Sequence, residues 1–139
     1  MAIDTREHIR WMLTRDTDSP MQDIGVEQSD AAIIAAFTVA TEKALGQAPA
    51  LDSVRQLLSS IRGTYVKAES LQPVQAEAVV RAAFGERDLL EGISYRDMVR
   101  IQLSVTYGII QVLNLSAAEF EVFLDEATEL ANDLSAQGR

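Results

Sequence analysis

Apolar residues recur every three or four positions along most of the chain, which is the period of an amphipathic α-helix. The clearest case begins at Ser116, where seven apolar residues keep this spacing: Phe120, Phe123, Leu124, Ala127, Leu130, Ala131 and Leu134. No convincing run of polar and apolar alternation, and no Asn-Gly or Asp-Gly hairpin turn, points to a strand. The pattern therefore predicts an all-α protein.

Local start and stop signals divide this pattern into about six helices. Three residue pairs have the spacing of a capping box, in which two side chains cap a helix start reciprocally: Asp4 with Glu7, Ser94 with Asp97, and Ser116 with Glu119. Pro73 suits a first helical position, and Gly46 and Gly85 suit helix ends. The expected helices begin at Asp4 and Ser116 and, between these, cover Asp30–Leu45, Asp52–Val66 (unless Gly63 ends it early), Pro73–Phe84 and Ser94–Leu113.

The length and composition fit one domain. The chain has 139 residues, of which 47% are hydrophobic, so it can bury a core without the help of disulfides or metals. It contains no cysteine, which excludes disulfides and thiolate chemistry and fits a cytoplasmic location. We therefore predict a single-domain bundle over residues 1–139, with a first helix and a polar loop in residues 1–28 and the bundle core in residues 29–137.

The net charge of −9 narrows the classes of partner. An acidic chain is poorly suited to neutralising nucleic-acid phosphates or binding anionic membranes, so neither partner is expected. The most apolar segment, Met98–Leu115, is too polar for a membrane span. A basic protein partner remains compatible with the charge.

The segment Ser94–Leu113 has an unusually wide apolar arc. On a helical wheel, Asp97, Arg100, Ser104, Tyr107, Gln111 and Asn114 share one polar band, whereas Gln102 and Thr106 lie inside the apolar arc. The wide arc indicates that this helix is either the central element of the bundle or part of an oligomer interface. Together with the alanine-rich second helix, it leads us to predict a homodimer. The polar band either lines a ligand pocket or lies at the surface, and the pocket interpretation names six candidates: Arg100, Gln102, Ser104, Thr106, Tyr107 and Gln111. Gly108 indicates a close helix approach.

The last predicted helix carries a row of carboxylates opposite its apolar face. Its members, each four residues from the next, are Glu121, Asp125, Glu129 and Asp133. Like charges at this spacing destabilise a helix by roughly 0.2–0.5 kcal/mol per pair. Either the row binds a basic partner, or it is solvated or pairs with arginines of other helices, such as Arg96 or Arg100.

The first predicted helix holds the only histidine, His8, on the same side as Trp11 and Arg15. With Arg6 and Arg10 nearby, this group is either an anion contact or a helix that packs through its tryptophan, and the second interpretation is favoured. In the loop that follows, Asp16, Asp18 and Glu27 have EF-hand spacing, but Pro20 and Met21 occupy positions that need an oxygen ligand and a glycine. No metal is therefore expected.

No catalytic motif supports an enzyme. There is no glycine-rich phosphate loop or nucleophile elbow, and one histidine cannot supply paired Glu-x-x-His motifs. We expect no cofactor. The sequence predicts a non-enzymatic protein-interaction or regulatory module that self-associates. Two alternatives remain: a small-molecule-binding helical bundle, and an acidic immunity- or antitoxin-like protein that binds a basic partner.

Overall fold

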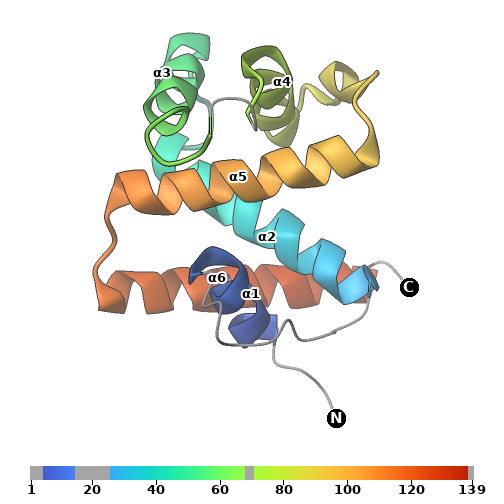
Figure 1. The fold of residues 1–139 in the computed structure, drawn as a ribbon. Helices are drawn as coiled ribbons and strands as arrows, with labels where there is room; N and C mark the ends of the chain where they lie inside the picture. Colours follow the sequence, from blue (N-terminus) through green and yellow to red (C-terminus); the bar gives the residue numbers. More distant parts are fainter. Residues whose placement is uncertain (1–4, 15–25, 68–70, 138–139) are drawn as a thin grey trace. The chain divides into compact units, whose positions relative to one another are not determined.

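The computed structural model of the chain describes residues 5–14, 26–67 and 71–137. Within these ranges it is all-α, as predicted, and contains no strand. No described helix is long and apolar enough to cross a membrane. The helices are α1 (Thr5–Thr14), α2 (Val26–Leu45), α3 (Leu51–Ile61), α4 (Pro73–Ala83), the short 3-10 helix η2 (Arg87–Leu90), α5 (Tyr95–Leu113) and α6 (Ala117–Gln137) (Figure 1).

The starts of α5 and α6 have the predicted caps. The Ser94 hydroxyl accepts a hydrogen bond from the Asp97 backbone N–H at 3.1 Å. At α6 the exchange is reciprocal: the Ser116 hydroxyl accepts from the Glu119 N–H at 3.1 Å, and the Glu119 carboxylate accepts from the Ser116 N–H at 2.9 Å. Asp97 has a shorter side chain and pairs with Arg100 instead. Both helix starts are therefore fixed by local hydrogen bonds that the sequence encodes.

One helix start differs from the prediction, and one helix takes the earlier of its two expected ends. Helix α2 begins at Val26, four residues before the expected Asp30. Helix α3 ends at Ile61 rather than Val66, because Gly63 adopts a left-handed φ of +84° and its N–H bonds to the Val66 carbonyl at 2.8 Å. The 3-10 helix η2 was not predicted. Asp4 of the first predicted capping box, and the acidic loop with Asp16 and Asp18, lie outside the described residues.

The chain divides into two compact units. The first comprises residues 1–39 and 115–139, and the second comprises residues 40–114. Helix α2 contributes to both, because the division falls after Val39. The sequence patterns did not predict this division, and the single domain over residues 1–139 stays a prediction.

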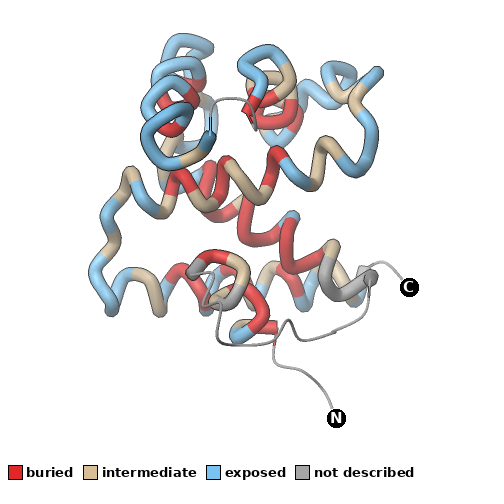
Figure 2. The backbone as a smooth tube through the Cα atoms, in the orientation of Figure 1, coloured by how far each residue is buried: buried red, intermediate tan, exposed pale blue. Residues whose placement is uncertain are grey.

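In the first unit, α1 packs along α6 (Figure 1). The N-terminal part of α2 joins them through small side chains, because Ala31 and Ala35 share a buried cluster with Ala131 of α6. Alanines at these positions allow helix backbones to approach closely. The largest fully buried side chains of the unit are Ile9, Phe37, Phe123 and Leu124. Figure 2 shows buried positions along α1, α2 and α6, which fits the apolar register that the sequence predicted for the last helix.

In the second unit, α3, α4 and α5 pack against one another, with η2 beside α4 (Figure 1). The core of this unit consists of fully buried branched side chains: Val54, Ile61, Val79, Val80, Ile101, Val105 and Ile109. The close approach indicated by Gly108 is confirmed within this unit. A Cβ atom at Gly108 would lie 2.9 Å from Cγ1 of Ile61 and closer still to its Cγ2. Helices α3 and α5 therefore pack with no room for an alanine at that point.

Candidate functional site

The carboxylate row of α6 divides into two halves. In the first half, Arg6 of α1 donates to Glu121 at 2.7 Å and to Asp125 at 2.9 Å. Arg10 of α1 donates to both carboxylate oxygens of Glu121, each at 2.9 Å. The arginines that neutralise the row thus come from α1. The expectation that Arg100 would do so is wrong, because Arg100 pairs with Asp97 of its own helix.

The paired half of the row is an attachment between α1 and α6. The hydrogen bond from Arg10 lowers the pKa of Glu121, and Arg6 adds to the effect. In return, the pKa values of Arg6 and Arg10 are raised, mainly by their hydrogen bonds to Asp125 and Glu121 respectively. These groups stabilise each other's charged forms across two helices, which is a structural role.

The other half of the row, Glu129 and Asp133, is exposed. Within the described part of the chain neither residue forms an ion pair. Glu129 therefore lies four residues from Asp125 and four residues from Asp133, and no described basic side chain neutralises it. Of the four predicted partner-binding residues, these two keep carboxylates that a basic partner could contact.

The six ligand candidates of α5 do not converge. Gln102 and Thr106 are buried, Ser104 and Tyr107 are half-buried, and Arg100 and Gln111 are exposed. The Thr106 hydroxyl donates to the backbone carbonyl of Gln102 at 2.7 Å, which satisfies it within the helix. The side-chain oxygen of Gln102 has no hydrogen-bond partner among the described residues. Because these residues point away from α5 in different directions, the helix alone does not form a pocket.

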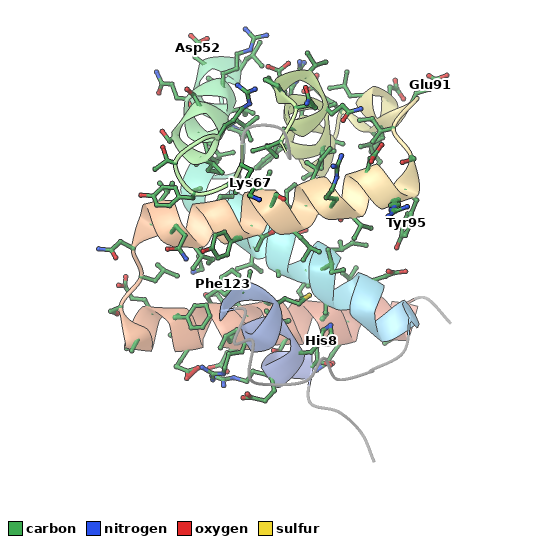
Figure 3. The ribbon with its side chains drawn as sticks, in the orientation of Figure 1. His8, Asp52, Lys67, Glu91, Tyr95 and Phe123 are labelled. Atoms are coloured by element: carbon green, nitrogen blue, oxygen red, sulfur yellow. The ribbon has the colours of Figure 1, made fainter. Side chains whose placement is uncertain are left out.

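His8 lies inside the first unit, where it is only 2% exposed (Figure 3). Burial lowers the pKa of its imidazole, because the charged form is poorly solvated there. Its neighbours Arg6 and Arg10 donate to α6 carboxylates, which supports a packing role for α1 over an anion contact. The side chain of Trp11 and all of Arg15 lie outside the described residues.

A pocket of about 460 Å³ lies between α3 and α4 in the second unit. We call it the α3–α4 pocket; its described lining is Arg55, Leu58, Ser59, Arg62, Leu71, Pro73, Val74, Ala76 and Glu77. Pockets that bind small molecules in proteins have volumes of roughly 300–1,000 Å³. Leu58, Leu71 and Ala76 are buried and form its apolar floor, whereas Val74 at the edge is 81% exposed.

Charged side chains surround this apolar floor. The Arg55 guanidinium donates to Glu77 at 2.6 Å, and Glu77 also lies 3.5 Å from Arg81. Arg81 in turn binds both carboxylate oxygens of Glu86 at 2.7 Å. The hydrogen bond from Arg55 lowers the pKa of Glu77, and that from Arg81 lowers the pKa of Glu86. Arg62 donates to the backbone carbonyl of Leu71 at 3.1 Å.

The sequence contained a signal for this pocket. Arg55, Leu58, Ser59 and Arg62 have the spacing that places residues on one face of a helix, and this face mixes arginines with a leucine. The facing residues of α4 could not be identified, because nothing in the sequence aligns α4 with α3. The described residues contain no group of three or more acidic or histidine side chains that could hold a metal.

Comparison with known proteins adds no constraint. No protein-family model, curated protein or solved structure matches the chain. The candidate binding sites are therefore the α3–α4 pocket and the unpaired half of the α6 row.

Proposed function

We propose that the chain is a binding module whose second unit holds a small amphipathic molecule in the α3–α4 pocket. The observation that carries the proposal is the combination of an apolar floor with two arginines and a glutamate in one concave lining. Of the functions considered from the sequence, this favours the small-molecule-binding bundle, although its residues differ from the predicted ones on α5. Few polar groups around a mostly apolar cavity is the usual composition of a ligand site.

The edge of the pocket supports the same proposal. Val74 leaves 81% of its surface exposed beside the buried Leu71 and Ala76. A ligand that covered Val74 while lying on the floor would remove apolar surface from water, which is favourable by roughly 25 cal/mol per Å². Ser59 and Pro73, also exposed, complete the edge without closing it.

A titration with 1-octanol, followed by NMR of the ¹⁵N-labelled chain, tests this proposal. We expect saturable shifts of the amides of Leu58, Leu71 and Ala76, with a dissociation constant on the order of 0.1 mM, so that saturation is reached below the solubility limit of 1-octanol. Ser59→Trp should block the pocket and abolish the shifts. The matched control Ser53→Trp makes the same change at an exposed serine of α3 outside the lining, and should leave them intact. Shifts that do not saturate, or that survive Ser59→Trp, would refute the proposal.

A second candidate function is contact with a basic protein through Glu129 and Asp133. The observation that favours it is the division of the α6 row, because only Glu121 and Asp125 are neutralised within the described chain. Its test is capture of partners by the immobilised chain, compared with the double variant Glu129→Lys, Asp133→Lys. A basic partner should be lost from this variant and retained by the control Asp52→Lys, Glu91→Lys, which reverses two exposed charges elsewhere. Equal capture by both variants would dismiss this function.

A further inference from the structure

We infer that the ligand of the α3–α4 pocket is an amphipathic monocarboxylate whose carboxylate binds Arg55 in exchange for Glu77. The inference rests on the proposed function and names the class of ligand for the same site. Four features of the second unit support it: the guanidinium groups of the described lining, the apolar floor beside them, the exposure of Arg55, and a second cation that can keep Glu77.

The described lining holds more guanidinium groups than carboxylates, although the chain is acidic. The described lining contains two guanidinium groups and one carboxylate, whereas the chain as a whole has a net charge of −9. A guanidinium presents two parallel N–H groups to a carboxylate and is therefore the side chain best suited to bind one. This charge complementarity favours an anionic ligand over a neutral or cationic one.

The apolar floor lies next to the guanidinium. Arg55 and Leu58 lie three residues apart on one face of α3, a rise of about 4.5 Å along the helix axis, and Arg62 lines the pocket just after the helix ends at Ile61. A carboxylate at Arg55 would thus place the following methylene groups over Leu58 and toward Leu71 and Ala76. An unbranched acyl chain has this combination of one charged end and an apolar body.

The ion pair that closes Arg55 is suited to exchange. The Arg55 side chain is 58% exposed and that of Glu77 is 20% exposed, so water reaches the pair mainly at the guanidinium. Water weakens an ion pair that it can reach. Glu77 also has Arg81 at 3.5 Å, so it keeps a cation when a ligand displaces it from Arg55. Arg81 meanwhile retains its bidentate contact with Glu86. The exchange therefore leaves no carboxylate of this network without a positive partner.

The experiment compares octanoate with 1-octanol, which share an eight-carbon chain and differ in charge, by NMR titration of the full chain. We expect octanoate to bind more tightly, by roughly tenfold for one charged hydrogen-bonded contact. Arg55→Gln should remove this preference, and Glu77→Gln should increase it by removing the competing carboxylate. The matched control Arg87→Gln removes an exposed arginine of η2 outside the lining, and should leave the preference unchanged.

The outcomes separate this inference from the proposed function. If octanoate and octanol bind the pocket equally in the unmodified chain, the carboxylate inference is overturned while the pocket remains a ligand site. If Arg55→Gln and Arg87→Gln lower the octanoate affinity to the same extent, the effect belongs to overall charge and the inference is likewise overturned. If neither compound shifts the lining amides, the proposed function itself fails. Amide spectra of each variant establish that it is folded.

Discussion

At the scale of single residues, Gly108 is the one described glycine at which an added Cβ atom would clash with a neighbour. A Cβ atom there would lie 3.1 Å from Cβ of Ile61 and closer to its two γ carbons, so the side chain of Ile61 or the helices must move. Gly108→Ala should destabilise the chain by about 1–3 kcal/mol. Alanine is the better helix former by about 1 kcal/mol, so the helix propensity alone predicts the opposite sign. Urea denaturation measures the difference.

Two further variants identify the cause of that loss. Gln111→Ala changes an exposed residue of the same helix and should alter stability by less than about 0.5 kcal/mol. Ile61→Ala removes the clashing atoms, so combining it with Gly108→Ala should cost less than the sum of the two single changes. Strict additivity would contradict the packing described for α3 and α5.

His8 gives a second prediction at this scale, concerning pH. Its folded-state pKa is below the ordinary value of 6.5, so between these two pKa values the unfolded chain binds a proton that the folded chain does not. The free energy of unfolding should therefore fall as the pH decreases from neutral through the ordinary pKa of 6.5 toward the lowered one. The contribution is fully present above the ordinary pKa and disappears as the pH falls through the lowered one.

The variant His8→Gln isolates this effect. Chemical denaturation at several pH values should show a flatter dependence in this window for His8→Gln than for the unmodified chain. The carboxylates with lowered pKa values, Glu77, Glu86 and Glu121, titrate below their ordinary value of 4.5 and therefore act in a separate window. Parallel curves for the two proteins would contradict the burial of His8 as the cause.

At the scale of elements, the two halves of the α6 row should respond oppositely to loss of charge. Glu121→Gln removes the carboxylate that Arg10 binds on α6 and one of the two that Arg6 binds there, while Arg6 keeps Asp125. It should destabilise the chain, with a loss that shrinks at high salt. The contribution of Glu121 is present above its ordinary pKa of 4.5 and is lost as the pH falls through its lowered pKa. Thermal unfolding at neutral pH, at low and high salt, measures it.

Glu129→Gln is the matched variant on the same helix. It removes the repulsion between the Glu129 carboxylate and the carboxylates at positions 125 and 133. Stability should therefore stay unchanged or rise by roughly 0.2–0.5 kcal/mol per relieved pair. If Glu121→Gln and Glu129→Gln have the same effect, the distinction between a paired and an unpaired half is wrong.

At this scale, the sequence predicts those features that depend on residues close to one another along the chain. The caps at Ser94 and Ser116 and the apolar register of α6 are short-range features, and all three are present. The start of α2 was misplaced because Glu27, Gln28 and Ser29 resemble loop residues by composition alone. The partners of Glu121 were missed because they lie on a helix more than one hundred residues earlier, and no local pattern specifies that pairing.

At the scale of the whole molecule, the homodimer was predicted from two features, the wide apolar arc of α5 and the alanines of α2. The apolar arc of α5 is buried or half-buried, and the alanines of α2 such as Ala35 and Ala36 are buried. These features are used within the chain, so the structure adds no support for a dimer. Sedimentation equilibrium at tens of micromolar protein decides the point. A mass twice that of the 15.2 kDa chain would support the dimer, and the mass of one chain would exclude it at that concentration.

The α3–α4 pocket could be predicted only in part, because it depends on how two helices align. The face of α3 with Arg55 and Arg62 is visible in the sequence, but the pocket also needs the first turns of α4. The α5 candidates were chosen from one helix, and one helix presents its residues in several directions. A concave site depends on the register between helices, which packing determines and spacing within a helix does not.

The central claim is that the α3–α4 pocket holds an amphipathic ligand, and a crystal structure of the chain with octanoate tests it most directly. We predict density between α3 and α4, with the acyl chain on Leu58 and Leu71 and the carboxylate bound to Arg55. Octanoate bound at a different place, or an unfilled pocket at a concentration that saturates the NMR titration, would contradict the claim.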